Sequence, residues 1–197
     1  MIRQLNGLSL KGIFYAMKII ETGFDGLYEI ESTVFGDDRG YFFESYRKKT
    51  FEELGIQTDF VQDNESFSVK GTLRGLHFQS QPYAQAKLVR VALGKVMDVA
   101  VDLRPNSSTF GKHHTVILDA KKHNLFLVPV GFAHGFLALE DSVFSYKCTN
   151  YYNKASEGGI LWNDPELNID WQIENPIVSE KDKLLPNFAA YKNAPLF

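Results

Sequence analysis

The chain has 197 residues, which suits one domain with a single core, and its 44% hydrophobic and 23% charged content is ordinary for a globular protein. The net charge is −3 and the basic residues are scattered, so we expect no nucleic-acid partner. A single cysteine, Cys148, excludes an intramolecular disulfide and a thiolate metal cage. No apolar run is long enough to span a bilayer, so we expect a cytoplasmic protein without a membrane partner.

The first sixteen residues show no clear pattern, whereas Met17 begins a segment typical of a strand. We therefore expect residues 1–16 to be an N-terminal extension, either poorly ordered or packed on a partner. Residues 17–197 are expected to form a single domain, because no repeat, low-complexity tract or linker divides them.

Short strands separated by turn residues follow along most of the chain, which is typical of a β-sandwich or barrel. The first strands are expected at residues 27–35 and 41–46, on either side of the turn-forming segment 36–40. A short helix is expected from Thr50, as its N-cap, to Gly55, which ends it. Further strands are expected at residues 87–93, 95–103, 115–118, 124–128, 135–139 and 143–152, and a second short helix at residues 179–185.

The segment 95–103 alternates clearly between apolar and other residues. Asp98 and Asp102 fall on one face. Gly94, which precedes the segment, indicates a hairpin or a tight corner. The opposite, apolar face holds Met97, Val99, Val101 and Leu103.

The segment 71–79 contains Arg74 and His77 and is the first candidate for chemistry. A lone histidine among apolar neighbours is more often a hydrogen-bonded core residue than a catalytic group. Arg74 favours a site, because a buried guanidinium needs an anionic partner such as a carboxylate or a phosphate. Strict alternation puts the two side chains on opposite faces, so a bulge at Gly75 is required to aim both into one cavity.

Three further segments each have a simple structural interpretation beside a functional one. His134 follows a proline and a glycine, a pattern that by itself favours a barrel corner. Tyr146 is either a half-buried aromatic residue or a proton donor. Ser179 and Asp182 have the spacing of a helix capping box. In addition, alternation places Gln62 and Asn64 on one face as hydrogen-bonding groups.

Taken together and in order, a set of segments resembles the dTDP-4-dehydrorhamnose 3,5-epimerase family from about Met17 to Asp182. Each motif is weak alone, but the ordered set is specific. The segments are 34–45, 60–64, 73–79, 87–90, 98–102, 131–136, 146–152, 156–160 and 161–165.

The resemblance implies an all-β, cupin-type β-barrel (jelly roll) with a few short helices, a homodimer, and no cofactor. It implies epimerisation of dTDP-4-keto-6-deoxy-D-glucose at carbons 3 and 5 to dTDP-4-keto-L-rhamnose, in dTDP-L-rhamnose biosynthesis. By similarity His77 is the base, Asp182 orients it, Tyr146 is the acid and Lys87 stabilises the enolate. The substrate-binding positions implied are Arg39, Glu44, Gln62, Asn64, Arg74, His134, Glu157 and Lys181.

We expect no metal site. Metal-dependent cupins carry the motif His-x-His followed by a glutamate, and the residues after His77 provide neither the second histidine nor the glutamate. His113 and His114 are adjacent, so on a strand they face opposite ways and cannot readily bind one ion.

Two departures from the family pattern concern fine specificity rather than the reaction. Ala86 lies before Lys87 where a glycine is common, and Asn168 also replaces a usual glycine. One alternative function is a relative that inverts only carbon 3 or only carbon 5. A different class, a non-catalytic cupin that binds sugar nucleotides, predicts loss of the base or the acid, and both His77 and Tyr146 are present.

Overall fold

The computed structural model describes residues 17–197, and the expectation for residues 1–16 lies outside the described residues. The helices are α1 (Lys48–Glu53), α2 (Glu180–Lys183) and α3 (Phe188–Asn193), with a 3-10 turn at Lys154–Ser156. The strands are β1 (Met17–Glu21), β2 (Tyr28–Ser32), β3 (Val34–Asp37), β4 (Gly40–Phe43), β5 (Gln62–Ser68), β6 (Thr72–Gln79), β7 (Lys87–Leu93), β8 (Lys95–Asp102), β9 (His113–Asp119), β10 (Leu125–Val128), β11 (Phe132–Ala138), β12 (Ser142–Cys148), β13 (Glu157–Gly159) and β14 (Ile177–Val178).

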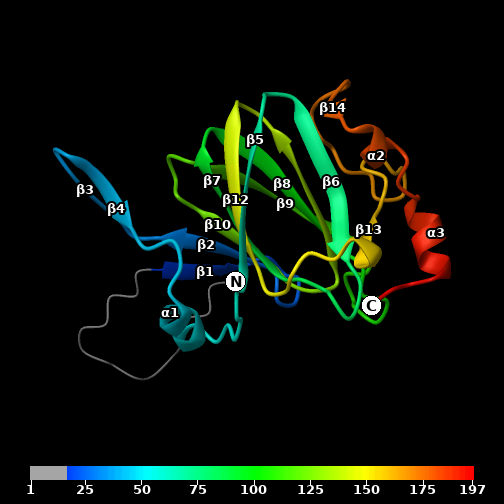
Figure 1. Ribbon diagram of the computed structural model, residues 1–197, viewed down its shortest axis with the longest axis horizontal. Helices are drawn as coiled ribbons and strands as arrows, with labels where there is room; N and C mark the ends of the chain where they lie inside the picture. The colour runs from blue at the N-terminus through cyan, green and yellow to red at the C-terminus, as the bar shows by residue number, and fades with distance from the viewer. Residues whose placement is uncertain (1–16) are drawn as a thin grey trace.

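Two six-stranded sheets form the body of the protein (Figure 1). The first sheet has the strand order β1-β2-β10-β7-β12-β5, and the second has the order β13-β6-β11-β8-β9 with β14 beside β6. Strands that follow one another in the chain, such as β7 and β8, lie in different sheets, as in a jelly roll. The all-β, cupin-type fold is thus confirmed, with hydrogen bonding that stays within each sheet and does not close into one ring.

Two glycines lie at corners where the chain changes sheet. Gly94 joins β7 to β8 with φ of +79°, and Gly131 joins β10 to β11 with φ of +91°. Left-handed backbone of this kind favours glycine because a Cβ atom would clash with its own backbone. The expected corner at Gly94 is confirmed, and so is the corner just before His134.

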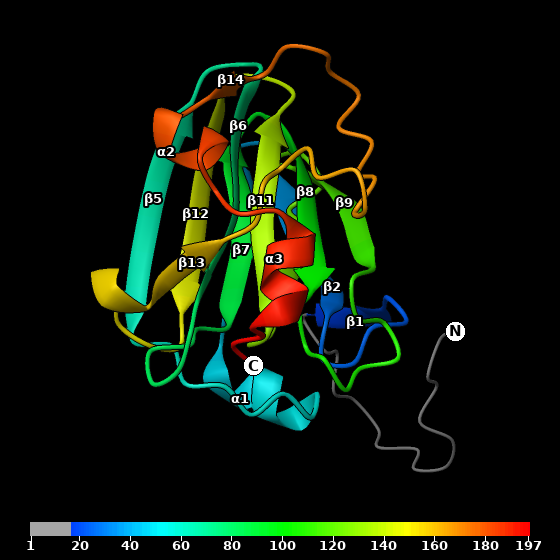
Figure 2. The same ribbon diagram turned by 90° about the vertical axis from the view of Figure 1, so that its right-hand side faces the viewer.

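The alternation expected for residues 95–103 is also confirmed. The apolar face of β8 packs under the C-terminal segment, where Met97 and Val99 lie in one core cluster with Trp171 and Tyr191. Figure 2 shows α3 lying across the outer face of this second sheet. The opposite face of β8 points between the sheets, where Val96 and Ala100 join a second core cluster with side chains of β7, β10, β11 and β12. Asp98 therefore lies, fully buried, between the two sheets.

The first expected helix is present, but its N-cap differs. Helix α1 begins one turn earlier, with Arg47 as N-cap and without a side-chain cap, and Thr50 is buried inside the helix. The Thr50 hydroxyl accepts a hydrogen bond from Arg47 Nε at 2.8 Å, so a local side-chain contact uses the group that the capping pattern required. Gly55 follows the helix with φ of +84°, as expected of a residue that ends it.

The single strand expected at residues 27–35 is two strands. Strand β2 belongs to the first sheet, whereas β3 pairs with β4 in a separate two-stranded hairpin. This hairpin projects from the body of the protein (Figure 1). Its aromatic side chains are largely exposed, with fractions of 59% for Phe35, 62% for Tyr41 and 69% for Phe42. Local β propensity predicted the strands but not the break between them.

No helix among residues 17–197 is long and apolar enough to cross a membrane.

Candidate active site

A cavity of about 510 Å³ opens between the two sheets. Strands β6 and β11 of the second sheet form one wall, and β7 and β12 of the first sheet form the opposite wall. Helix α2 closes part of its edge. The predicted site residues that line this cavity are Arg74, His77, Lys87, His134, Tyr146, Lys181 and Asp182.

A bulge in β6 brings Arg74 and His77 into the same cavity. His134 of β11 pairs with His77, whereas Phe136 pairs with Arg74, so β6 uses three steps where β11 uses two. Gly75 supplies the extra residue with φ of +131°, and a Cβ atom there would lie 2.5 Å from the Cα of Gly135. The bulge predicted at Gly75 is therefore confirmed.

His77 and Asp182 form a hydrogen-bonded pair, with 2.7 Å between His77 Nε2 and Asp182 Oδ1. The other carboxylate oxygen accepts the Gly75 backbone N–H at 3.4 Å. Burial by itself raises the pKa of Asp182, but the hydrogen bond from His77 and the Gly75 N–H outweigh it, and the net shift is downward. Asp182 is thus held as a carboxylate that orients the imidazole and leaves Nδ1 for the cavity.

The helix cap expected at Ser179 is present, but only as half of a capping box, because the Asp182 carboxylate contacts His77 and Gly75 and not the Ser179 N–H. The Asp182 backbone N–H donates to the Ser179 hydroxyl, the N-cap of α2, at 3.1 Å. The cap uses the Asp182 backbone, which leaves the carboxylate free to reach His77. The short helix therefore delivers the side chain to the cavity.

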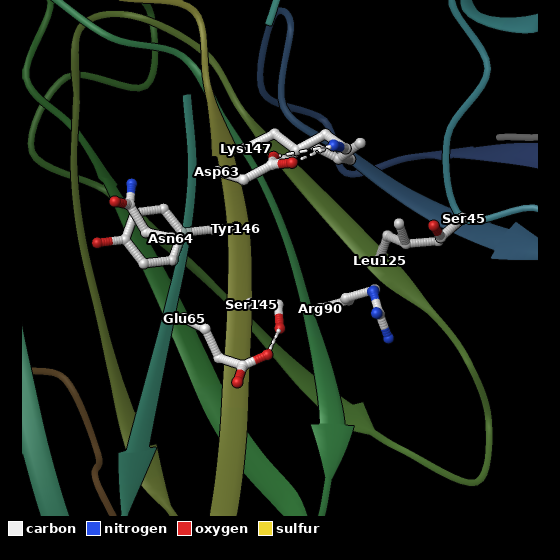
Figure 3. A pocket seen from close by; sticks show the side chains of 10 residues that line it. Ser45, Asp63, Asn64, Glu65, Arg90, Leu125, Ser145, Tyr146 and Lys147 are labelled. Carbon is white, nitrogen blue, oxygen red and sulfur yellow. Dashed lines mark hydrogen bonds and ion pairs between the residues drawn. The ribbon is translucent and has the colours of Figure 1, made fainter. Parts of the chain in front are cut away.

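Tyr146 lies on β12, on the wall that faces His77. In Figure 3, Asn64 and Tyr146 turn to one side of their strands, whereas Asp63 and Lys147 form an ion pair on the other side. That other side is the outer face of the first sheet, where a separate depression lies. Burial raises the pKa of the Tyr146 phenol, Cys148 adds to the shift and Arg74 opposes it. The hydroxyl therefore stays protonated at neutral pH, as a proton donor must.

Lys87 enters the cavity from the end of β7. Burial lowers the pKa of its ammonium, a shift that Cys148, Asp98 and Glu157 oppose. Its side chain makes no hydrogen bond or ion pair within residues 17–197. An ammonium without a protein partner in a cavity is available to a substrate oxygen.

Gln62 and Asn64 lie on one face of β5, as expected. Gln62 Nε2 donates to Asn64 Oδ1 at 2.9 Å, and Asn64 pairs across the ladder with Tyr146. Glu157 lies at the rim, where it binds Lys181 Nζ and accepts a hydrogen bond from the Tyr152 hydroxyl at 3.2 Å. None of these three residues is among those that line the cavity.

The Arg74 guanidinium is not buried, and the phosphate partner expected for it stays a prediction. Arg74 is exposed at the cavity mouth, where its guanidinium donates to Ser68 Oγ at 3.0 Å and to the Phe67 carbonyl at 3.1 Å. No carboxylate pairs with it among the described residues. The guanidinium therefore keeps donors free for a ligand.

Arg39 and Glu44 lie away from the cavity. Arg39 is at the tip of the β3–β4 hairpin, 90% exposed and paired with Asp37. Glu44 follows the hairpin and interacts with Arg47 and Thr50 near α1. Within one protomer, the structure does not bring these two residues together with His77.

A second histidine–carboxylate pair, which the sequence did not single out, lies beside the first. His134 Nε2 and Asp98 Oδ1 are 2.7 Å apart, and both side chains are buried. The signal was present in the sequence as an aspartate among the apolar residues in the middle of a strand. The alternation pattern alone did not indicate which residue the Asp98 carboxylate contacts.

Residues 17–197 contain no group of three or more His, Cys, Asp or Glu side chains placed to hold a metal ion. The two adjacent histidines face opposite ways. His114 hydrogen-bonds Glu29 at 2.8 Å and contacts the Phe24 and Phe126 rings, whereas His113 lies near the Leu167 backbone.

Comparison with known proteins connects this geometry with one family. The model of the family described as dTDP-4-dehydrorhamnose 3,5-epimerase matches residues 21–190. A protein of that name from Escherichia coli K12 is 52% identical over 172 residues, which is 86% of this chain and 93% of the relative.

Solved structures agree. The dTDP-4-dehydrorhamnose 3,5-epimerase of Elizabethkingia anophelis is 54% identical, with a TM-score of 0.85 over 89% of this chain and 98% of that one. The dTDP-6-deoxy-D-glucose-3,5-epimerase of Legionella pneumophila, solved with dTDP-4-keto-L-rhamnose, is 48% identical, with a TM-score of 0.81 over 87% of this chain and 98% of that one.

Proposed function

The chain belongs to the dTDP-4-dehydrorhamnose 3,5-epimerase family, and we propose that it converts dTDP-4-keto-6-deoxy-D-glucose into dTDP-4-keto-L-rhamnose by inverting carbons 3 and 5. The protein is an isomerase. The reaction belongs to dTDP-L-rhamnose biosynthesis.

The observation that carries the mechanism is that His77 and Tyr146 reach one cavity from opposite sheets. Inversion of a carbon beside a ketone removes a proton from one face of the sugar ring and returns a proton to the other. A ring held between the sheets has the imidazole on one side and the phenol on the other, as this chemistry requires.

His77 is the base in this proposal. The carbon–hydrogen bond breaks towards Nδ1, and the electron pair moves onto the ketone oxygen as an enolate. Asp182 stabilises the imidazolium that forms, because its carboxylate accepts the hydrogen bond from Nε2.

Tyr146 completes the inversion by giving its phenolic proton to the same carbon from the opposite side. His77 then holds one proton more and Tyr146 one fewer, and exchange with solvent restores both. Lys87 places its ammonium beside the enolate oxygen, where a positive charge lowers the energy of the intermediate.

The diphosphate lies at the cavity mouth in this proposal. Arg74 and Lys181 are the cations there, and a guanidinium with free N–H groups is suited to a phosphate. His134, Gln62, Asn64 and Glu157 bind the sugar and the nucleotide.

A homodimer is the proposed assembly. Arg39 and Glu44, which match substrate-binding positions of the family, lie on or beside a hairpin that extends away from its own cavity. The exposed aromatic side chains of that hairpin are suited to an interface with another protein chain. The hairpin therefore serves the active site of a partner protomer. The proposed compartment is the cytoplasm, which fits an unpaired cysteine and a nucleotide-sugar substrate.

The test is incubation with dTDP-4-keto-6-deoxy-D-glucose in deuterium oxide, with products followed by NMR. We expect deuterium at both carbon 3 and carbon 5 and the L-configured product. Deuterium at one carbon would identify a single-carbon epimerase, and binding without exchange would identify a non-catalytic cupin. Activity is expected to survive a chelator, and loss that a divalent ion restores would contradict the proposed metal-free chemistry.

A further inference from the structure

Asp98 is a buried carboxylate to which the proposed chemistry gives no role. It lies on β8 with 0% of its surface exposed, and its Oδ2 atom has no hydrogen-bond partner in the described structure. A buried carboxylate oxygen without a donor is costly and is uncommon in folded proteins. Such a group is explained more readily by function than by stability.

Asp98 makes its one hydrogen bond to a residue of the cavity. Strand β8 pairs with β11 so that Asp98 is opposite Phe136, and the aspartate reaches diagonally to His134 at 2.7 Å. This contact occupies Nε2. The other ring nitrogen, Nδ1, has no partner within residues 17–197, and the ring lines the cavity.

The His134–Asp98 pair repeats the geometry of the His77–Asp182 pair. The two histidines are direct neighbours across the β6–β11 ladder, and each uses Nε2 to bind a carboxylate oxygen at 2.7 Å. In both pairs the carboxylate decides which edge of the ring faces the cavity.

The two carboxylates differ in their surroundings. Burial raises the pKa of Asp98, and His134 and Lys87 oppose the shift, whereas the net shift of Asp182 is downward. The charge of Asp98 is therefore linked to His134 and Lys87, which both line the cavity. Two carboxylates whose pKa values are shifted in opposite directions commonly have different roles in one site.

We propose that Asp98 is a positioning residue, which accepts the Nε2–H of a His134 imidazolium so that its Nδ1–H faces the substrate, and which holds His134 and Lys87 as neighbouring donors to the enolate oxygen. The proposal rests on the proposed epimerase function. Asp98 touches no substrate atom and acts through the two side chains that do.

The experiment compares Asp98→Asn with Asp102→Asn in the full-length protein. Both aspartates are fully buried on β8, but Asp102 pairs with Arg104, Ser107 and Thr109 outside the cavity. We expect Asp98→Asn to lower kcat by about tenfold to a hundredfold while the KM changes little, because ground-state binding is kept and the enolate is less well stabilised. Asp102→Asn is expected to lose stability and keep kcat.

A nitrogen-15 NMR measurement of the imidazole groups gives a readout that a structural role would not change. The chain has five histidines, and His134→Gln identifies the His134 signal by its loss. In the wild-type protein we expect protons on both Nε2 and Nδ1 of His134, and a hydrogen-bond shift of Nε2 that Asp98→Asn removes and Asp102→Asn keeps. The wild-type spectrum tests the proposal even if Asp98→Asn does not fold, since an unprotonated Nε2 would overturn it.

Double substitution completes the test. If Asp98 acts mainly through His134, Asp98→Asn lowers kcat less in a His134→Gln background than in the wild type. Equal effects in both backgrounds, or a wild-type kcat in folded Asp98→Asn, would overturn the inference. Failure of the wild-type enzyme to exchange deuterium would instead overturn the proposed function.

Discussion

In the proposed reaction, His77 removes the first proton with one ring nitrogen, Nδ1. His77→Ala removes the proposed base and should abolish deuterium exchange at both carbons. A general base contributes about a hundredfold to ten-thousandfold, so the loss is expected in that range. Exchange is measured by NMR in deuterium oxide, with dTDP binding as the control for folding. Near-wild-type exchange would exclude His77 as the base.

Tyr146 is tested by removing a single oxygen. Tyr146→Phe keeps the ring that lies 6.1 Å from Phe144 but cannot return a proton. His77 still forms the enolate and gives the proton back to the original face, so exchange should continue while inversion falls. The quantity to measure is the ratio of exchange to inversion at each carbon, which cancels differences in folded protein. A ratio equal to that of the wild type would remove Tyr146 as the acid.

At the level of the strand, the bulge in β6 directs the side chains of Arg74 and His77 into one cavity. Gly75→Ala adds a Cβ atom 2.5 Å from the Cα of Gly135 and strains a backbone with φ of +131°. We expect a loss of about 2 kcal/mol of stability, with weaker dTDP binding because Arg74 and His77 are displaced. Gly36→Ala is the control, since its nearest contact is an ordinary 3.6 Å. Equal melting temperatures for the two variants would contradict this account.

The end of β8 is stabilised by Asp102. Burial by itself raises the pKa of Asp102, but hydrogen bonds from Arg104, Ser107 and Thr109 outweigh it and lower the pKa from 3.8 to about 2. A lowered folded-state pKa gives stability that is present above about pH 4 and is lost as the pH falls towards about 2. Asp102→Asn should therefore cost on the order of 2 kcal/mol at pH 7. Urea unfolding should show this difference shrinking below pH 4, and a difference independent of pH would be contrary to the expectation.

Asn168 shows how an element can accept a departure from the family pattern. By the resemblance it stands where a glycine is expected, and it adopts a φ of +47°. Asparagine tolerates the left-handed conformation better than most residues, so the loop keeps its shape without glycine.

The hairpin of β3 and β4 is the part of the molecule that we expect to contact a second protomer. Phe35 and Phe42 pair across the hairpin and are more than half exposed. The double variant Phe35→Ser and Phe42→Ser should shift a dimer towards monomer and lower activity, since partner contacts are lost while the core is untouched. Light scattering measures the mass. Leu196→Ser, which also changes an exposed apolar residue, should leave both mass and activity unchanged. A fully active dimer of the double variant would exclude the hairpin from the interface.

The sequence by itself determined the features that depend on neighbouring residues. The alternation along β8, the bulge required at Gly75 and the Ser179 cap all follow from the spacing of residues in one segment, and each is found in the structure. The ordered set of motifs also identified the family, because several local segments that are weak alone become specific when they occur together and in order.

Only the tertiary structure decided which segments meet. The Asp98 carboxylate lies 36 residues from His134 in the chain, and no local period predicts their contact. The same limit explains why local patterns did not show that Arg74 is exposed, or that Arg39 and Glu44 lie away from the cavity that contains His77. Local patterns fix the face on which a side chain lies, whereas the packing of two sheets fixes what that face meets.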